Sequence, residues 1–137
     1  MIEGIGIDVV DVSRFKATLE RTPAVANRLF TERELVGNQY LGSRSSGGSR
    51  SASGERALVS LAGKFAAKEA LYKALHVDGS VRHALSFHEA EIFNEPNGRP
   101  AFLFYGALAT LLSGTKVHLS ISHDGAIATA FVVIERH

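Results

Sequence analysis

The longest stretch with helical spacing of apolar residues runs from Leu58 to His76. Alanine, leucine, lysine and glutamate dominate it and no proline interrupts it, so the composition favours a helix. Lys64 and Lys68 form the plainly polar flank, and small residues cover the side opposite the apolar stripe. So little polar surface predicts a central, mostly buried helix. The apolar stripe consists of Leu58, Leu61, Phe65 and Tyr72.

Glu69 interrupts this apolar stripe. Glutamate is almost never fully buried unless it is paired or binds a metal ion. One interpretation is an i,i+4 ion pair with Lys73 at a solvated edge. The other is a carboxylate that holds a cation on the central helix, with lysines nearby for an anion. The helix alone leaves both interpretations open.

The first eleven residues alternate as a strand does. Ile5, Ile7 and Val9 share the apolar face, and the other face carries only Gly4, Gly6 and Asp8. Glycine within a strand often marks the close approach of a ligand or of another backbone. We therefore expect Asp8 to stand beside an opening, whereas Asp11 suits a turn or helix cap.

Two hairpins are expected after the central helix. A strand from Leu85 to Phe93, a turn from Asn94 to Gly98 and a strand from Arg99 to Phe104 form the first. The second turns at Asp124-Gly125 between strongly alternating strands, and a short helix from Gly106 to Leu112 precedes it. The pattern predicts an α+β fold in which an antiparallel sheet, together with the N-terminal strand, wraps on one long central helix.

Short helices are expected between the first strand and the central helix, with Thr31 to Glu34 as a capping box. Gly42 to Gly54 is rich in serine and glycine and is expected to be a flexible loop within one domain, residues 1–137. The exposed side of the short helices carries a local excess of basic residues. This excess is a candidate docking surface for an acidic protein: Arg14, Arg21 and Arg28.

Composition excludes several classes of function. The chain has no cysteine, which rules out disulfides and thiolate chemistry, and its net charge of +1 provides no general basic field for nucleic acid. No apolar run is long enough to span a membrane, and the first residues lack the pattern of a signal peptide. We therefore expect a cytoplasmic protein that binds neither membrane nor nucleic acid.

Two carboxylates, Asp8 and Glu69, each lie on an otherwise apolar or bare face. Magnesium prefers oxygen ligands and completes its shell with water and substrate phosphates, so this pair suits Mg²⁺. The chain also offers cations for phosphate groups, namely Lys64, Lys68, Lys73, Arg99 and His123. The residues alone therefore indicate magnesium-assisted phosphoryl chemistry without naming a substrate.

Four sequence motifs carry a resemblance to a known family. GIGIDVVDVSRF at Gly4 to Phe15 and FAAKEALYKA at Phe65 to Ala74 resemble the two signature motifs of the 4′-phosphopantetheinyl transferases. The short chain, NGRP at Asn97 to Pro100 and SISHD at Ser120 to Asp124 are similar to the bacterial holo-[acyl-carrier-protein] synthase branch. The Ser/Gly loop departs from the family pattern because it is longer and more repetitive.

The resemblance implies an enzyme of fatty acid biosynthesis, and hence of lipid metabolism. It would move the 4′-phosphopantetheine group of coenzyme A to a serine of apo-acyl carrier protein and release adenosine 3′,5′-bisphosphate. Small members of the family are similar to one another in being homotrimers with sites between subunits. We therefore expect a homotrimer, although the chain is long enough to bury a core alone.

The resemblance also assigns roles to individual residues. Asp8 and Glu69 would hold Mg²⁺, and Lys73 would stabilise the leaving phosphate, so these three form the catalytic set. The serine proton would go to Glu69 or to a metal-bound water, and Arg14, Arg21 and Arg28 would meet the carrier protein. A turn with Asp124 is the alternative role for His123. The residues expected around the coenzyme are Lys64, Lys73, Asn97, Gly98, Arg99, Pro100 and His123.

The same residues are also consistent with two functions of other classes. One is a magnesium-dependent phosphohydrolase that uses the same carboxylates on a nucleotide. The other is a non-catalytic nucleotide-binding module in which Glu69 only pairs with Lys73. Modification of a carrier protein distinguishes the transferase from both.

Overall fold

The computed structural model describes residues 1–37 and 52–137 of the chain. Its first half contains β1 (Ile2–Asp11), α1 (Val12–Arg21), α2 (Ala24–Leu29), α3 (Glu32–Gly37) and α4 (Ala52–Ala74). Its second half contains α5 (Gly79–Ala84), the 3₁₀ helix η2 (Phe87–Glu89), β2 (Ala90–Asn94), β3 (Pro100–Phe104), α6 (Gly106–Leu111), β4 (Thr115–Asp124) and β5 (Ile127–Arg136).

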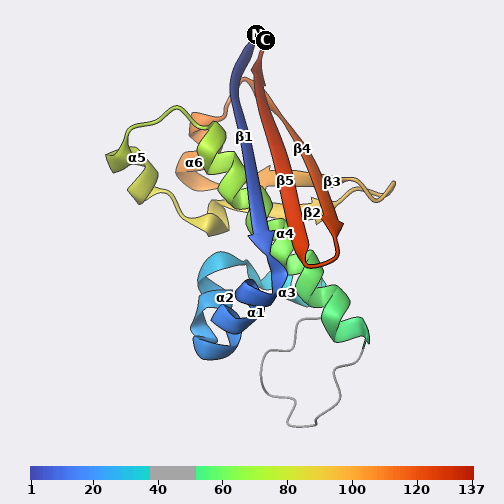
Figure 1. Ribbon diagram of the computed structural model, residues 1–137. Coiled ribbons are helices and arrows are strands. Elements are labelled where there is room, and N and C mark those ends of the chain that lie inside the picture. Colours follow the sequence, from blue (N-terminus) through green and yellow to red (C-terminus); the bar gives the residue numbers. More distant parts are fainter. Residues whose placement is uncertain (38–51) are drawn as a thin grey trace.

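Helix α4 is the centre of the fold, as predicted. One face of an antiparallel sheet, in the order β1-β5-β4, packs on it, and β2 and β3 form a separate two-stranded sheet (Figure 1). The three short helices α1, α2 and α3 gather near the N-terminal half of α4, whereas the two chain ends lie together at the other end of the long sheet. The α+β prediction is confirmed, with two sheets in place of one.

The glycine face of β1 lies against α4. A Cβ atom added to Gly6 would lie 1.8 Å from the carbonyl oxygen of Ala70, and one added to Gly4 would lie 1.9 Å from that of Ala74. Only a strand without side chains at these positions allows such close approach of the helix backbone. The approach that the glycines predicted is therefore to a helix, and it brings Asp8 to the side of α4.

The apolar face of β1 points away from the core. Ile5, Ile7 and Val9 are each more than half exposed, and Phe131 lies opposite Ile7 on β5. Alternate residues of β5 face inward and are buried against α4. The inward set consists of Ala128, Ala130, Val132 and Ile134.

Several boundaries differ from the sequence expectations. Helix α4 ends at Ala74 rather than His76. The strand expected from Leu85 begins only at Ala90, because η2 precedes it, and the helix α5 follows Asp78 in a segment for which no helix was expected. Residues 42–51 of the predicted Ser/Gly loop, 42–54, lie outside the described part of the chain. The last three residues of the predicted loop belong to α4.

The predicted helix caps and the turn of the first hairpin are confirmed. Asp11 caps α1 by accepting a hydrogen bond from the Arg14 backbone, and Thr31 and Glu34 form the capping box of α3. Gly98 has a positive φ of 87° in the turn between β2 and β3. Among the described helices, none is long and apolar enough to cross a membrane.

Candidate active site

The carboxylate of Asp8 meets α4 at the β1 edge of the long sheet. Lys73 Nζ donates hydrogen bonds to Asp8 Oδ1, at 2.8 Å, and to the backbone carbonyl oxygen of Ile7, at 3.1 Å. The Lys73 side chain is half exposed, whereas that of Asp8 is largely covered. Lys73 is thus held by β1 while its ammonium group still reaches solvent.

Glu69 lies one turn before Lys73 on α4 and is half-buried. Burial raises its pKa, and the negative charge of Asp8 raises it further, whereas Lys73 and Arg82 act in the opposite direction. Lys73 forms its ion pair with Asp8, so the simple Glu69–Lys73 pair does not describe this site. The three residues form one charged cluster where β1 meets α4.

Two partly buried carboxylates of like charge suit a hard divalent cation. The negative charges of Asp8 and Glu69 repel each other, and a divalent cation bound by both would offset this unfavourable interaction. Among the described residues, no cluster of three or more His, Cys, Asp or Glu side chains can hold a metal ion. The two carboxylates by themselves fit Mg²⁺, which commonly takes one or two carboxylates and completes its shell with water and substrate phosphates.

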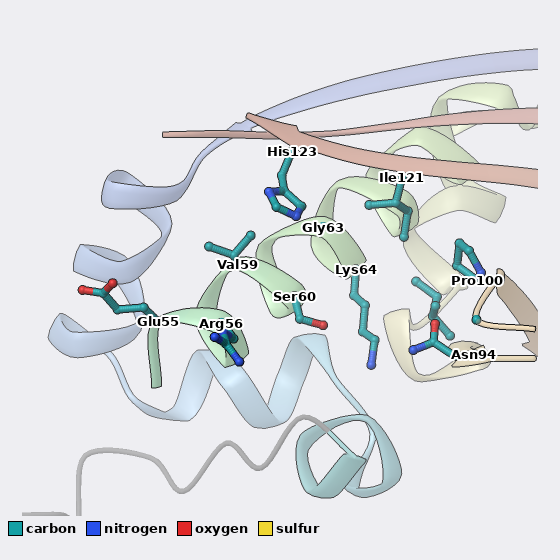
Figure 2. A pocket seen from close by; sticks show the side chains of 12 residues that line it. Glu55, Arg56, Val59, Ser60, Gly63, Lys64, Asn94, Pro100, Ile121 and His123 are labelled. Carbon is teal, nitrogen blue, oxygen red and sulfur yellow. The ribbon is translucent and has the colours of Figure 1, made fainter. Parts of the chain in front are cut away.

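A cleft of about 650 Å³ opens on the other side of α4 (Figure 2). Lys64 and Ser60 of α4, Asn94 of β2, Pro100 of β3 and His123 of β4 are among its lining residues. Figure 2 shows the His123 ring directed from β4 toward the part of α4 that carries Ser60 and Lys64. The cleft thus combines a buried cation and an imidazole with small and apolar surfaces.

The predicted coenzyme residues fall into two groups. Lys64, Gly98, Pro100 and His123 line the cleft, whereas Lys73 lies with Asp8 on the opposite side of α4. Asn97 and Arg99 are in the exposed turn that carries Gly98, where Arg99 N donates to Asn97 Oδ1. Neither of these two side chains is part of the cleft lining.

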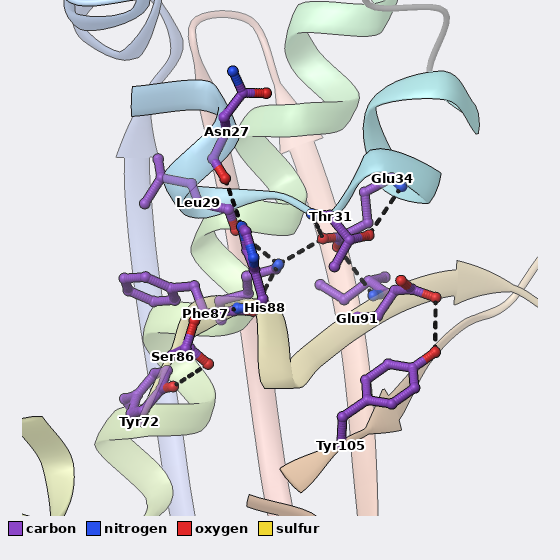
Figure 3. Close-up of polar contacts among 12 residues, drawn as sticks. Asn27, Leu29, Thr31, Glu34, Tyr72, Ser86, Phe87, His88, Glu91 and Tyr105 are labelled. Atoms are coloured by element: carbon purple, nitrogen blue, oxygen red, sulfur yellow. Dashed lines mark hydrogen bonds and ion pairs between the residues drawn. The ribbon is translucent and has the colours of Figure 1, made fainter. Parts of the chain in front are cut away.

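Lys64 and Lys68, which the sequence predicts as the polar flank of the central helix, do not face solvent. Lys68 is fully buried and Lys64 is 8% exposed. Lys68 Nζ donates to Glu34 Oε1 at 2.6 Å and to the backbone carbonyl oxygens of Leu29 and Phe87 (Figure 3). Lys68 therefore joins α4 to the segments around α3 and η2 and is not placed to bind a substrate phosphate.

The sequence did not reveal some residues that shape the cleft, or the buried carboxylates that lie beneath it. Gly63 allows β4 to approach α4, because a Cβ atom there would lie 2.9 Å from Ile121 Cγ2. The carboxylates of Glu34 and Glu91 are buried next to the two lysines. Glu34 was assigned only to a capping box. Its position three residues after Thr31 gave no sign that it also meets α4.

The basic side chains of the first two helices are exposed. Arg14 and Arg21 belong to α1 and Arg28 to α2, at the end of the molecule where the short helices gather. They lie outside the lining of the cleft and outside the Asp8 cluster. Their position is compatible with a docking role separate from the chemistry.

The sequence model of the 4′-phosphopantetheinyl transferase superfamily matches residues 4–130. The chain belongs to this superfamily. The match includes β1 with Asp8, helix α4 with Glu69 and Lys73, and the strand that carries His123. The enzyme class predicted from the two signature motifs is confirmed, and the chain is a phosphopantetheinyl transferase.

Similar members of the superfamily cover the whole chain. The holo-[acyl-carrier-protein] synthase of Salinispora arenicola is 45% identical over an alignment of 139 positions, which covers 99% of this chain and 100% of that protein. The corresponding protein of Beutenbergia cavernae is 43% identical over an alignment of 141 positions, which again covers 99% of this chain and 100% of that protein.

Solved structures of this superfamily share the fold. A holo-(acyl-carrier-protein) synthase from Bacillus anthracis, in complex with CoA (3′,5′-ADP), has a TM-score of 0.75 and 33% identity, covering 100% of this chain and 99% of that chain. The synthase from Neisseria meningitidis has a TM-score of 0.76 and 32% identity, covering 99% of this chain and 100% of that chain.

Proposed function

We propose that this transferase moves the 4′-phosphopantetheine group of coenzyme A to a serine of an apo-acyl carrier protein. The observation that carries the proposal is the contact between the two signature motifs, where Lys73 on α4 pairs with Asp8 on β1 beside Glu69. The printed names of the similar proteins, and the coenzyme bound to the Bacillus anthracis synthase, support this substrate pair. We expect the carrier protein to serve fatty acid biosynthesis.

Lys73 is the cation best placed for the diphosphate of coenzyme A. Its ammonium group has three N–H donors, of which Asp8 and the Ile7 carbonyl group accept two, so one remains for a substrate oxygen. A charge-assisted contact there would stabilise the leaving phosphate as its negative charge grows. The part that Lys73 plays is therefore electrostatic stabilisation.

Asp8 and Glu69 would hold Mg²⁺, which would bind the diphosphate oxygens and neutralise part of their charge. Chelation should then abolish turnover and added Mg²⁺ should restore it. Asp8→Ala should remove most activity and leave the free energy of unfolding nearly unchanged. Near-normal turnover of Asp8→Ala at limiting Mg²⁺ would show that the metal assignment is wrong.

A homotrimer with sites between subunits would bring the two halves of the site together. Lys64 and Lys73 are nine residues apart, about two and a half turns, and so point to opposite sides of α4. The cleft lies at the β4 edge of the sheet and the Asp8 cluster at the β1 edge. The exposed apolar residues of β1 and β5 offer a surface for subunit contact, because large apolar patches mark interaction sites.

The release of adenosine 3′,5′-bisphosphate from coenzyme A tests the proposed reaction. Chromatography should detect this product only when enzyme, Mg²⁺ and apo-acyl carrier protein are all present. A carrier protein whose acceptor serine is replaced by alanine is the matched control, and it should give no product. Consumption of coenzyme A without any carrier protein would instead identify a phosphohydrolase.

A further inference from the structure

The charged residues that are buried in the described part of the chain form one layer beneath the cleft. Glu34, Lys64, Lys68 and Glu91 are at most 8% exposed. The layer joins α4 to α3 and β2, which are far apart in the sequence. Buried charges are costly unless they interact with opposite charges, so each of the four needs a partner.

Lys68 and Glu34 satisfy each other almost completely. Besides the Lys68 ammonium group, Glu34 Oε1 accepts a hydrogen bond from Thr31 N at 2.9 Å and Oε2 accepts one from Ile92 N at 3.0 Å. Figure 3 shows these contacts between the α3 segment and β2. This pair fixes the position of the Glu34 carboxylate one helical turn from Lys64, on the same side of α4.

Lys64 is the member of the layer that reaches the cleft. The carboxylates that act on its ammonium group are Glu34 from α3 and Glu91 from β2. Lys68 lies one helical turn away on the same side of α4. His123 of β4 and Glu55 and Arg56 of α4 line the same cleft. Burial lowers the pKa of Lys64, and the two carboxylates counteract this effect.

Glu91 is held in place by the neighbouring elements. Tyr105 donates a hydrogen bond to its Oε1 at 3.4 Å, and the guanidinium group of Arg33 lies 3.7 Å from the same oxygen. Figure 3 shows the Tyr105 ring reaching Glu91 from beyond β3. Glu91 is 5% exposed and is not part of the cleft lining, so its carboxylate does not contact a ligand in the cleft directly.

We propose that Glu91, together with Glu34, is a positioning residue that keeps Lys64 in its ammonium form at the cleft wall, ready to bind a phosphate group of coenzyme A. This inference rests on the proposed function, since it assumes that the cleft receives the coenzyme. A buried lysine without these carboxylates would lose its proton more readily. A neutral amine would then offer no charge to the phosphate.

The test is the binding of adenosine 3′,5′-bisphosphate, measured by calorimetry between pH 8 and 10. The phosphates are almost fully ionised in this range and unperturbed histidines are neutral. Affinity should be constant until Lys64 loses its proton and should then fall to the lower affinity of the protein with a neutral amine. In Glu91→Gln this fall should begin at a lower pH, because one opposite charge has been removed. Between the two transitions the variant should therefore bind about tenfold more weakly than the wild-type protein, as expected for one lost charge-assisted contact.

Lys64→Arg in the Glu91→Gln background is the decisive companion variant. Arginine keeps its charge throughout this range, so the fall in affinity should disappear. Glu95→Gln, the same change at an exposed glutamate of the hairpin turn, should behave like the wild-type protein. Circular dichroism at each pH checks that the variants remain folded.

The outcomes separate this inference from the proposed function. A uniform loss of affinity at all pH values in Glu91→Gln, or a fall that persists in the Lys64→Arg double variant, would overturn the role assigned to Glu91. No binding of the bisphosphate by the wild-type protein would overturn the proposed coenzyme site itself. Normal binding without transfer to a carrier protein would contradict only the transfer reaction.

Discussion

Two lysines of α4, five residues apart, show how the surroundings decide what an ion pair does. Lys68 and its partner Glu34 are completely buried, and the lysine also donates to two backbone carbonyl groups. Lys73 pairs with Asp8 but remains half exposed. A buried pair is costly to break, whereas an exposed pair contributes little to stability. We therefore expect Lys68 to matter mainly for stability and Lys73 mainly for the proposed reaction.

Methionine at each position tests this assignment. Lys68→Met leaves the Glu34 carboxylate buried without its counter-charge and should lower the free energy of unfolding by about 3–5 kcal/mol. Lys73→Met should change it by ~1 kcal/mol or less, yet turnover should fall about 100-fold or more, as for other electrostatic contacts to a transition state. Urea unfolding and the release of adenosine 3′,5′-bisphosphate measure the two quantities. A large loss of stability in Lys73→Met, with a large loss of turnover but unchanged stability in Lys68→Met, would contradict this assignment.

At the scale of elements, the contact between β1 and α4 places the carboxylates. Gly6→Ala would push a methyl group into the backbone of α4 at Ala70 and should cost about 3 kcal/mol or more, because neither element can move freely. Gly79→Ala is the matched control, since a Cβ atom there meets nothing within 4 Å. That control should stay within ~0.5 kcal/mol of the wild-type protein in urea unfolding. Equal stability of the two variants would contradict the close packing.

The sequence was sufficient for most elements and for one half of the site. Alternation and turn residues predict strands well, and Asp8 and Glu69 were recognisable because each carboxylate interrupts an apolar or bare face. Periodicity did not reveal that Lys68 is buried, because its partner Glu34 comes from a distant segment. Helix α5 was missed because it is short and has no buried residue, although Asp78 caps it by accepting a hydrogen bond from Val81 N.

The first helix should act in recognition rather than in catalysis. If Arg14 meets carboxylates of the carrier protein, Arg14→Glu should raise the KM for the carrier at least about tenfold, because like charges then oppose each other across the interface. The KM for coenzyme A should hardly change. Added salt should weaken docking of the wild-type protein, since the Debye length is only ~8 Å at physiological ionic strength. Equal effects on both KM values would place Arg14 at the coenzyme.

At the scale of the whole molecule, the proposed trimer predicts that inactive subunits can complement each other. Asp8→Ala damages the cluster at the β1 edge and His123→Ala damages the cleft at the β4 edge. If one site takes these residues from different subunits, mixed assemblies contain some intact sites and should recover up to about a quarter of the activity. Subunits are exchanged by refolding the two variants together. A monomer in light scattering at working concentration would contradict the shared site.

The most direct test of the central claim is the intact mass of the carrier protein. Apo-acyl carrier protein is incubated with coenzyme A, Mg²⁺ and this enzyme and is then analysed by mass spectrometry. Transfer of the phosphopantetheine group should add roughly 340 Da, the mass of one transferred phosphoryl-linked arm, at a single serine. A carrier protein that keeps its original mass, while coenzyme A is either intact or hydrolysed, would contradict the proposed function.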